Sequence, residues 1–481
     1  MTSGDAAATA GMPPGEDHKP RRRGFMQSLT ALCVRYVERL MPDPYLFAVI
    51  LTLLVAALVG LLVHDASPSG MLQAWYGGVW GSQNIFTFAF QMVLILVTGY
   101  TLAEAPVLKR AIVYIAGKPN NQVQGALLCF GVSAVLSLLN WGLGLVAGAL
   151  VARQVAKRFT DAHFGYLIAA AFMGFIIWTQ GLSSSIALAN TDDSSPINVI
   201  HKLTGITVPL QLTIFQPYSW LSVIVVLALL ALAIWRMEPA ESLAPDPAVF
   251  EDEEQPEDKA SPGKRTFAEW LEDLWILNVL VFAAGMAYFV LSGFALNIAS
   301  MIMLFTITSA LLHRTPIRFI RAFTGAAKVS GPLLLQYPLY GGLVGLLGYQ
   351  AAEGVKPLQT LLAEMLVNGA TQYTLPFLTF IGSLIISLFV PSGGGHWAVQ
   401  GPIAVDSALA LGQDSPAYLG LISMAVAVGE GVANMIQPFW LLPLLAIAKL
   451  NVRQVMGFTV VAFLIGVVVL GATTLIAPFV I

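Results

Sequence analysis

The sequence contains a series of apolar runs, several of which reach the roughly 20 residues that a helix needs to cross a bilayer. Of its 481 residues, 57% are hydrophobic and only 11% are charged, and the mean hydropathy is +0.76. A soluble protein carries about 25% charged residues. Cys33 and Cys129 are too few for a disulfide framework. We therefore expect an all-α polytopic membrane protein that lies in a lipid bilayer and has no nucleic-acid partner.

One apolar stretch is interrupted at residues 391–397, which read PSGGGHW. Three consecutive glycines disfavour a helix interior because each loses backbone entropy on ordering. Pro391 and Pro402 bracket the interruption and remove helical hydrogen bonds. Facing lipid, such a break would leave backbone groups unsatisfied, so it must face protein or water. The run is therefore a candidate binding site.

The apolar pattern predicts about nine transmembrane helices plus two re-entrant hairpins. The expected spans are about 45–63, 85–102, 164–186, 218–235, 276–291, 296–312, 329–347, 417–447 and 455–477, with a short amphipathic piece at 358–367. The expected hairpins, about 123–152 and about 374–411, turn at residues 140–144 and at the glycine run. The third and eighth spans are expected to break, at 180–185 and at 429–431.

The basic residues orient this layout. If both hairpins return to the side they enter from, all 24 Lys and Arg except Lys202 and Lys356 fall on one face. The positive-inside rule then puts the N-terminus in the cytoplasm and the C-terminus outside. The expected parts are a cytoplasmic tail (1–40), a first membrane repeat (41–235), an acidic cytoplasmic linker (236–270) and a second membrane repeat (271–481).

The two halves are expected to be inverted repeats, because their hairpins would enter from opposite sides. A shift of 252 residues places residues 140–144 on 392–396 and Tyr166 on Tyr418. Each half would therefore supply one hairpin with a glycine-rich tip and one broken helix that follows it.

The hairpin tips and broken helices predict a site for a small anion. Helix N-termini carry unpaired N–H groups and a partial positive charge. The nearby donors include no arginine, which suits a carboxylate, and Trp141, Trp397 and Trp440 offer apolar walls for a short alkyl tail. The expected substrate-binding residues are Asn140, Trp141, Gly142, Gly144, Ser183, Ser185, Ser392, Gly393, Gly394, Gly395, His396, Trp397, Gln400, Asn434 and Gln437.

Each feature also has a purely structural interpretation. Glycines in membrane helices often serve close packing, Ser183 and Ser185 could bond back to their own helix, and tryptophans often anchor at the membrane interface. His396 could be a satisfied structural histidine. We favour function for His396 and Glu430, because ionisable groups inside membranes are rare. Unwound carbonyls could instead coordinate Na⁺.

Six stretches of the chain carry a resemblance to a known family: FAFQM (88–92), VTGY (97–100), NWGLGLV (140–146), QYPLY (336–340), VPSGGGHW (390–397) and NMIQPFW (434–440). Through these stretches the chain resembles the bacterial short-chain fatty acid uptake transporters of the acetoacetate/butyrate permease type. The resemblance implies uptake of small monocarboxylates across the bacterial inner membrane. It also implies distant similarity to an ion-transporter superfamily with paired hairpins and elevator-like motion.

These observations predict a secondary transporter for short-chain monocarboxylates such as butyrate or acetoacetate, without a cofactor or bound metal. Inward movement of an anion is opposed by about 2.3 kcal/mol per 100 mV of membrane potential. A cation must therefore accompany an accumulated substrate. We expect H⁺, with Glu430 as its carrier, because burial favours the neutral form of a carboxyl, and with His396 donating to the substrate.

Several alternatives remain open at this point. The chain could be a Na⁺-coupled symporter or a passive channel. It could also be a membrane-embedded acyl-transfer enzyme that uses His396 as a base beside Ser392, although catalysis has no need of two opposed hairpins. Modules of this kind often form homodimers, on which the sequence is silent.

Overall fold

The structure, a computed structural model, describes residues 44–81, 84–239, 241–251, 266–388, 390 and 392–481. The described residues form helices and loops, without a β-strand. The expected N-terminal tail (1–40), the centre of the acidic linker and Pro391 lie outside them. The all-helical expectation is confirmed for the described part of the chain.

The helices follow one another with short connections, and η marks a 3₁₀ segment. Up to the linker they are α2 (Pro44–Leu62), α3 (Pro68–Val79), α4 (Phe86–Ala103), α5 (Pro106–Ala116), α6 (Gln122–Leu139), α7 (Trp141–Arg158), α8 (Phe164–Gly174), η1 (Phe175–Gln180), α9 (Ser185–Asn190), α10 (Val199–Thr204), η2 (Leu210–Leu212), α11 (Pro217–Arg236) and α12 (Ala248–Glu251). Beyond it they are α13 (Phe267–Glu272), α14 (Ile276–Leu291), α15 (Ile298–His313), α16 (Pro316–Ala327), η4 (Lys328–Ser330), α17 (Gly331–Leu347), α18 (Leu358–Val367), α19 (Leu375–Ser387), α20 (Gly393–Ala410), α21 (Pro416–Ala433), η5 (Asn434–Ile436), η6 (Phe439–Leu441), α22 (Leu442–Ala448), α23 (Arg453–Ile476) and η7 (Ala477–Phe479).

Most apolar spans were located from the sequence to within two residues at each end. The helices concerned are α2, α4, α11, α14, α15, α17 and α23. The amphipathic piece expected at 358–367 is α18. Proline at the first helical position helps to define several of these starts, because its fixed φ suits a helix and its missing N–H has no partner there.

Among the described helices of more than ten residues, three were not expected, namely α3, α5 and α16. Each begins at a proline whose preceding residue has an extended backbone: Ser67, Ala105 and Thr315. They were missed because they are shorter and more polar than a transmembrane span. The start signal was nevertheless present in the sequence as an X-Pro pair.

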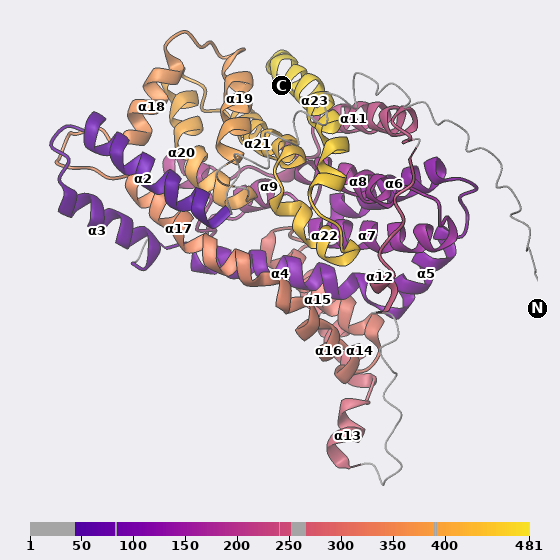
Figure 1. Cartoon of the computed structure of the whole chain (residues 1–481). Helices are drawn as coiled ribbons and strands as arrows, with labels where there is room; N and C mark the ends of the chain where they lie inside the picture. Colours follow the sequence, from indigo (N-terminus) through magenta and orange to yellow (C-terminus); the bar gives the residue numbers. More distant parts are fainter. Residues whose placement is uncertain (1–43, 82–83, 240, 252–265, 389, 391) are drawn as a thin grey trace, which may run out of the picture.

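Helix α4 runs across the middle of the molecule in Figure 1, with α2, α3, α17 and α18 on one side, α6–α8 and α11 on the other, and α14–α16 below. Small residues allow α3 and α17 to approach closely: a Cβ on Gly78 would lie 2.7 Å from the carbonyl carbon of Gly341. Such glycine contacts are typical of packed membrane helices.

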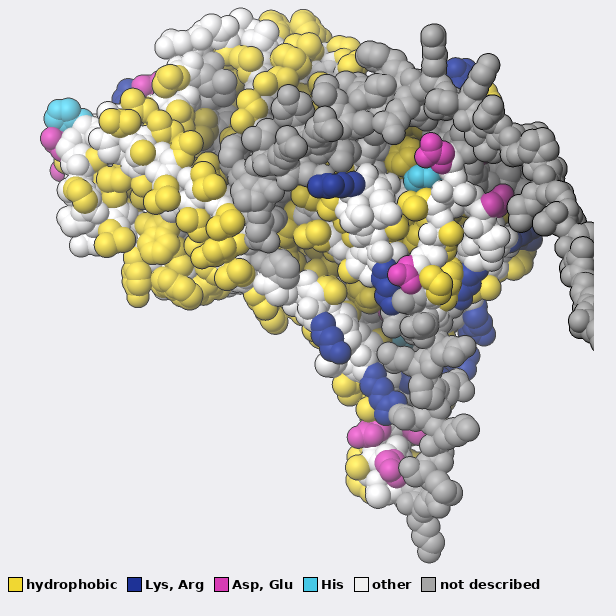
Figure 2. Space-filling model, in the orientation of Figure 1, with side chains coloured by type: hydrophobic (Ala, Val, Ile, Leu, Met, Phe, Trp, Pro, Cys, Tyr) yellow, Lys and Arg dark blue, Asp and Glu magenta, His cyan; other side chains and the backbone are white. Residues whose placement is uncertain are grey.

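In the part of the chain that the structure describes, six helical segments are long and apolar enough to cross a membrane: Phe86–Ala103, Gln122–Leu139, Phe164–Asn190, Pro217–Arg236, Pro416–Ile436 and Arg453–Phe479. Shorter apolar helices include Ile276–Leu291 and Ile298–His313. Figure 2 shows a nearly continuous hydrophobic surface on the lobe around α2 and α3, whereas Lys and Arg gather over the part that carries α14–α16. These features are those of a multi-pass membrane protein.

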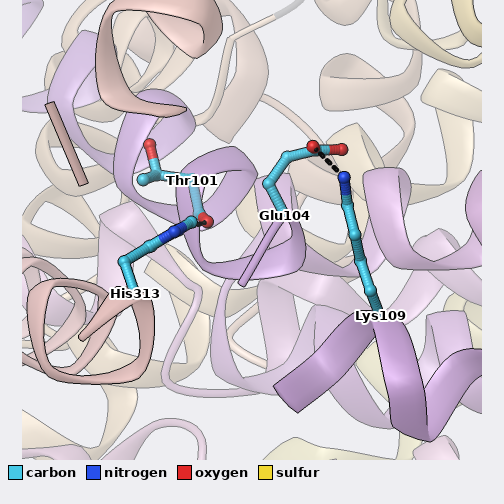
Figure 3. A network of polar contacts seen from close by, with 4 residues as sticks. All are labelled: Thr101, Glu104, Lys109 and His313. Atoms are coloured by element: carbon cyan, nitrogen blue, oxygen red, sulfur yellow. Dashed lines mark hydrogen bonds and ion pairs between the residues drawn. The ribbon is translucent and has the colours of Figure 1, made fainter. Parts of the chain in front are cut away.

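The end of α4 is held by two neighbouring helices (Figure 3). The ring of His313, the last residue of α15, donates from Nε2 to the carbonyl oxygen of Thr101 at 2.8 Å. One residue past the end of α4, Glu104 forms a 2.6 Å ion pair with Lys109 of α5. The terminal turn of α4 is therefore joined to both α15 and α5.

Candidate functional site

Helices α6 and α7 form a hairpin, called hairpin one, with Asn140 alone between them. A Cβ on Gly144 would lie 2.6 Å from the Ser137 nitrogen, and one on Gly148 would lie 3.0 Å from Cβ of Ser133. Towards the open end, a Cβ on Gly125 would lie 2.5 Å from Cγ1 of Val155. These pairs lie progressively further from Asn140, so the two helices run antiparallel.

Helices α19 and α20 form the second hairpin, hairpin two. The Gln400 amide donates to the Thr379 carbonyl at 2.9 Å. At the open end, the Gln413 amide donates to Gln372 Oε1 at 2.7 Å. In each predicted hairpin the two helices therefore lie side by side from the tip to the open end.

The two hairpin tips have the same local geometry. Asn140 has φ −154° and ψ 120°, and its side chain accepts a 2.9 Å hydrogen bond from the Leu143 nitrogen at the start of α7. Ser392 has φ −158° and ψ 116°, and its hydroxyl accepts from the Gly395 nitrogen at 3.4 Å at the start of α20. Both are N-caps, and they are the residues that the 252-residue shift aligns.

The helices after the hairpins also start alike. His163 caps α8 by accepting from the Tyr166 nitrogen at 3.1 Å, and Ser415 caps α21 by accepting from the Tyr418 nitrogen at 3.2 Å. These caps are again 252 residues apart. This agreement in backbone and capping geometry is what the predicted internal repeat requires.

The first broken helix has its break where it was expected. Helix α8 continues into η1, the chain becomes extended at Gly181, and α9 begins at Ser185. The Ser183 nitrogen donates to the Leu138 carbonyl of hairpin one at 3.2 Å. The break therefore packs on the end of α6, next to the tip of hairpin one.

The break expected at residues 429–431 in the second half is wrong. Helix α21 continues to Ala433, and the extended residue is Gln437, with φ −112° and ψ 125°. Gln437 precedes Pro438, whose ring forces an extended backbone on the residue before it. Gly429 and Gly431 instead allow close packing, because Cβ atoms there would lie 2.5 Å from Cβ of Ser383 and 2.7 Å from the Ile176 carbonyl oxygen.

The tip of hairpin two meets both broken helices at Gly393. A Cβ at Gly393 would lie 2.5 Å from Ser185 Oγ, 2.7 Å from Trp178 Cη2 and 3.4 Å from Glu430 Oε2. Ser185 belongs to α9, Trp178 to η1 and Glu430 to α21. Three of the predicted site residues, from both halves of the chain, are therefore brought together at one point.

The polar groups at this point are buried and lack partners. Glu430 is 0% and Ser185 1% exposed. Within the described part of the chain, the two carboxyl oxygens of Glu430 have no hydrogen-bond partner, and the Ser185 hydroxyl has none either. Buried polar groups are normally hydrogen-bonded, so these exceptions need an explanation, and a bound substrate or ion is one. The first N–H groups of the 18-residue helix α20 begin beside them.

The other residues of this tip face α4 and α17. The Ser392 hydroxyl donates to the Tyr337 hydroxyl at 2.6 Å. A Cβ on Gly395 would lie 3.0 Å from the Tyr340 ring, and one on Gly394 would lie 2.5 Å from Cε1 of Phe88. Gly394 is therefore next to a ring of α4 and not next to space for a ligand.

His396 belongs to a network within hairpin two. Because the Gln400 amide nitrogen donates to the Thr379 carbonyl, its oxygen faces His396 Nε2 at 2.6 Å. The ring must therefore carry a proton on Nε2, and Nδ1 of a neutral ring is an acceptor. In this arrangement neutral His396 cannot donate to a carboxylate, and it ties α20 to α19 together with Gln400.

An aromatic row extends from the tip of hairpin one. The Trp141 ring packs edge-to-face on Trp440 with centroids 4.7 Å apart, and Trp440 lies 6.1 Å from Phe175. Phe175 stacks on Trp178 at 5.6 Å. The row of Trp141, Trp440, Phe175 and Trp178 thus connects the tip of hairpin one with Gly393 of hairpin two.

The remaining predicted residues support the tips. The Asn140 amide donates to the Ile95 carbonyl of α4 at 3.3 Å, and Gly142 packs on Leu96. Asn434 accepts from Trp178 Nε1 at 3.1 Å, which joins the two broken helices. The Trp397 ring lies against Gly401 of its own helix. Ser183 and Gln437 are buried beside the breaks, and Gly144 packs on Ser137.

Sequence reasoning missed Trp178, Phe88 and Tyr337. Trp178 was detectable, because the 252-residue shift places it on Glu430, so both residues occupy the same position in the two broken helices. Phe88 and Tyr337 lie in two of the stretches that carry the family resemblance (88–92 and 336–340), but nothing there indicated that they reach the tip of hairpin two across a large separation in sequence.

Comparisons with known proteins agree over nearly the whole chain. A family model described as "Short chain fatty acid transporter" matches residues 25–476. A protein of Escherichia coli (strain K12), named "Putative short-chain fatty acid transporter", is 36% identical over 443 residues, which cover 91% of this chain and 96% of that protein. A protein of the same name from Haemophilus influenzae (strain ATCC 51907 / DSM 11121 / KW20 / Rd) is 33% identical over 447 residues, covering 89% and 95%.

Two solved structures have a similar fold. The YdaH transporter of Alcanivorax borkumensis superimposes with a TM-score of 0.54 at 16% identity, covering 91% of this chain and 99% of its own. MtrF of Neisseria gonorrhoeae, described with a class of antimetabolite efflux pumps, gives a TM-score of 0.55 at 16% identity, covering 93% and 98%. At this identity the likeness concerns the fold alone.

Proposed function

The chain belongs to the short chain fatty acid transporter family, and from this premise we propose that it is a proton symporter that takes up short-chain monocarboxylates across the bacterial inner membrane. The N-terminus lies in the cytoplasm and the C-terminus outside, with about nine spans and two re-entrant hairpins. The distribution of Lys and Arg along the chain supports this orientation.

The substrate carboxylate binds at the start of α20, beside Gly393. The N-terminal N–H groups of that helix and the Ser185 hydroxyl supply donors, since Ser185 Oγ lies 2.5 Å from the Cβ position of Gly393. Gly393 has no side chain, so the backbone can approach the anion directly.

The observation that carries the proposed coupling is the position of Glu430. Its buried, unpartnered carboxyl lies beside the place where the anion binds. Two adjacent carboxylates cannot both be ionised without strong repulsion. Of the described Lys and Arg only Arg153 is buried, and it makes no hydrogen bond to the Glu430 carboxyl. An anion therefore binds here with a proton on Glu430.

The buried site requires alternating access. Ser185 and Glu430 are closed off from solvent, so a substrate can enter only after a conformational change. The hairpins and broken helices pack on one another at Gly181, Gly429 and Gly431. They pack on α4 and α17 through the two tips and, on α4, also through the side of α7, where Val146 lies against Leu102 and Ala103. We propose that this bundle moves against α4 and α17 in an elevator-like motion.

The proposal is tested by uptake of labelled butyrate into proteoliposomes under separately imposed H⁺ and Na⁺ gradients. The wild-type protein should accumulate butyrate with a pH gradient. Glu430→Gln should lose gradient-driven accumulation yet retain butyrate exchange at equal pH on both sides. Glu364→Gln, which changes an exposed carboxyl paired with Lys356, is the matched control and should behave as wild type.

Accumulation that needs Na⁺ and ignores pH, or accumulation by Glu430→Gln under a pH gradient, would refute the proton-carrier role. A passive channel would show conductance without counterflow exchange. The acyl-transfer alternative needs Ser392 and His396 as a hydrogen-bonded pair. In the structure Ser392 donates to Tyr337 and His396 to Gln400, which favours transport.

A further inference from the structure

The two hairpin tips are alike in backbone but differ in one side chain. Asn140 and Ser392 have nearly the same φ and ψ and cap 18-residue helices in the same way. The residue after the cap is Trp141 in hairpin one and Gly393 in hairpin two. The largest side chain therefore stands at one tip where the other has none.

Repeat symmetry pairs the polar group beside the second tip with one in the other half of the chain. The shift that aligns the tips also aligns Ser185 with Gln437. Ser185 lies beside Gly393, and its hydroxyl has no partner among the described residues. Gln437 is 3% exposed, and its Oε1 likewise has no partner in the part of the chain that the structure describes. The first tip therefore has a helix N-terminus, and repeat symmetry assigns the buried Gln437 of the second half to it.

Trp141 changes what the first of these half-sites can bind. Its ring is 2% exposed and lies on Trp440, in the aromatic row that ends at Trp178 beside Gly393. An apolar tail that leaves a carboxylate at Gly393 therefore meets aromatic surface. At the second tip the missing side chain lets Ser185 and Trp178 approach the backbone closely, whereas the first tip carries an indole at the same position.

We propose that the aromatic row is the subsite for the alkyl tail of the substrate, and that Trp141 restricts the transporter to monocarboxylates by occupying the place where a second carboxylate would bind. This inference rests on the proposed carboxylate site at Gly393. It assigns the two tips different tasks: the tip of hairpin two binds the charged end, and that of hairpin one binds the apolar end.

The tail subsite predicts how affinity depends on chain length. Acetate, propionate, butyrate and pentanoate are tested as competitors of labelled butyrate in proteoliposomes. Each methylene buried on the aromatic row should improve affinity about fourfold in the wild-type protein. Glutarate, a five-carbon dicarboxylate, should not compete.

Trp141→Gly gives the first tip the residue of the second. In this variant the gain per methylene should fall below about twofold, because the aromatic wall is lost, and glutarate should compete with butyrate. Trp141→Phe is the matched control, since it keeps an aromatic ring and should retain the chain-length dependence and the exclusion of glutarate. Folding of each variant is checked by size-exclusion chromatography in detergent.

Trp440→Leu is an independent second variant, which removes the neighbouring ring and leaves Trp141 in place. It should reduce the gain per methylene without admitting glutarate. If wild-type protein transports no monocarboxylate, the proposed function itself fails. If wild type transports but Trp141→Gly and Trp440→Leu both retain the fourfold gain per methylene, the tail subsite is refuted. Continued exclusion of glutarate by folded Trp141→Gly refutes the selectivity role.

Discussion

Gly394→Ala tests how closely hairpin two fits against α4. The added Cβ would lie 2.5 and 2.6 Å from Cε1 and Cε2 of Phe88, and closer still to Cζ. Phe88 is fully buried and packs edge-to-face on Tyr337, with centroids 5.7 Å apart. Tyr337 in turn accepts a hydrogen bond from Ser392. The ring cannot move aside without displacing residues that hold the tip.

The expected cost is that of overpacking a rigid core, about 1–3 kcal/mol of the free energy of unfolding. At an unhindered helical glycine the same substitution should stabilise by up to about 1 kcal/mol. Gly325→Ala on α16 is the matched control, because a Cβ there meets nothing within 4 Å. The two substitutions should therefore change stability in opposite directions.

The measurement is the apparent melting temperature of detergent-solubilised protein, followed by size-exclusion chromatography and accompanied by butyrate uptake. Phe88→Leu removes the atoms that Gly394→Ala would meet. The double variant should be more stable than the sum of the single effects by at least about 1 kcal/mol. Additive effects would refute the clash. Loss of uptake that persists in a stable double variant would show that Gly394 serves the approach of the substrate.

Two further predictions concern topology and pH. In a background without Cys33, single cysteines at the open end of hairpin one should be labelled only from the cytoplasmic side. Single cysteines at the open end of hairpin two should be labelled only from outside. If the two positions of either pair were labelled from opposite sides, the re-entrant assignment of that hairpin would be wrong. The positions are Lys118 and Lys157 for hairpin one, and Thr371 and Asp414 for hairpin two. Burial lowers the pKa of His163 below its ordinary value of 6.5. The unfolded chain therefore takes up this proton first, and stability should fall as pH drops below about 6.5. His163→Ser, which keeps a cap of the kind found at Ser415, should show a smaller loss of melting temperature between pH 7.5 and 5.5; an unchanged loss would contradict this assignment.

The helix positions could be predicted because apolar length and proline starts are local signals. Spans such as α14 (Ile276–Leu291) are continuous apolar runs between polar ends. Helices α5 and α16 were missed because their apolar residues cover only one face, alongside basic residues such as Arg318. A search for full apolar spans does not detect such helices, although their X-Pro starts would have marked them.

The break in the second half was misplaced because glycine has two uses in a membrane helix. Gly429 and Gly431 suggested unwinding, yet both are close-contact sites inside α21. The decisive residue was Pro438, which acts on Gln437. Local sequence does not distinguish these uses, because the deciding contacts, to Ser383 and Ile176, come from other helices.

The meeting of Gly393, Ser185 and Glu430 was only partly predictable. Repeat symmetry indicated that tips and breaks would converge, and it named Ser185 and Gly393. It did not show that Gly394 faces Phe88, or that Gln400 fixes the tautomer of His396. Those facts depend on side-chain packing between elements far apart in the chain.

The burial of Ser185 and Glu430 affects how any measured affinity must be interpreted. A substrate binds only those molecules whose site is open, so the apparent dissociation constant equals the intrinsic one divided by the open fraction. If about one molecule in a hundred is open, measured binding is about a hundredfold weaker than the site itself allows. Tyr337→Phe, which keeps the ring but removes the hydroxyl bonded to Ser392, would then tighten apparent binding by raising the open population, without touching the substrate.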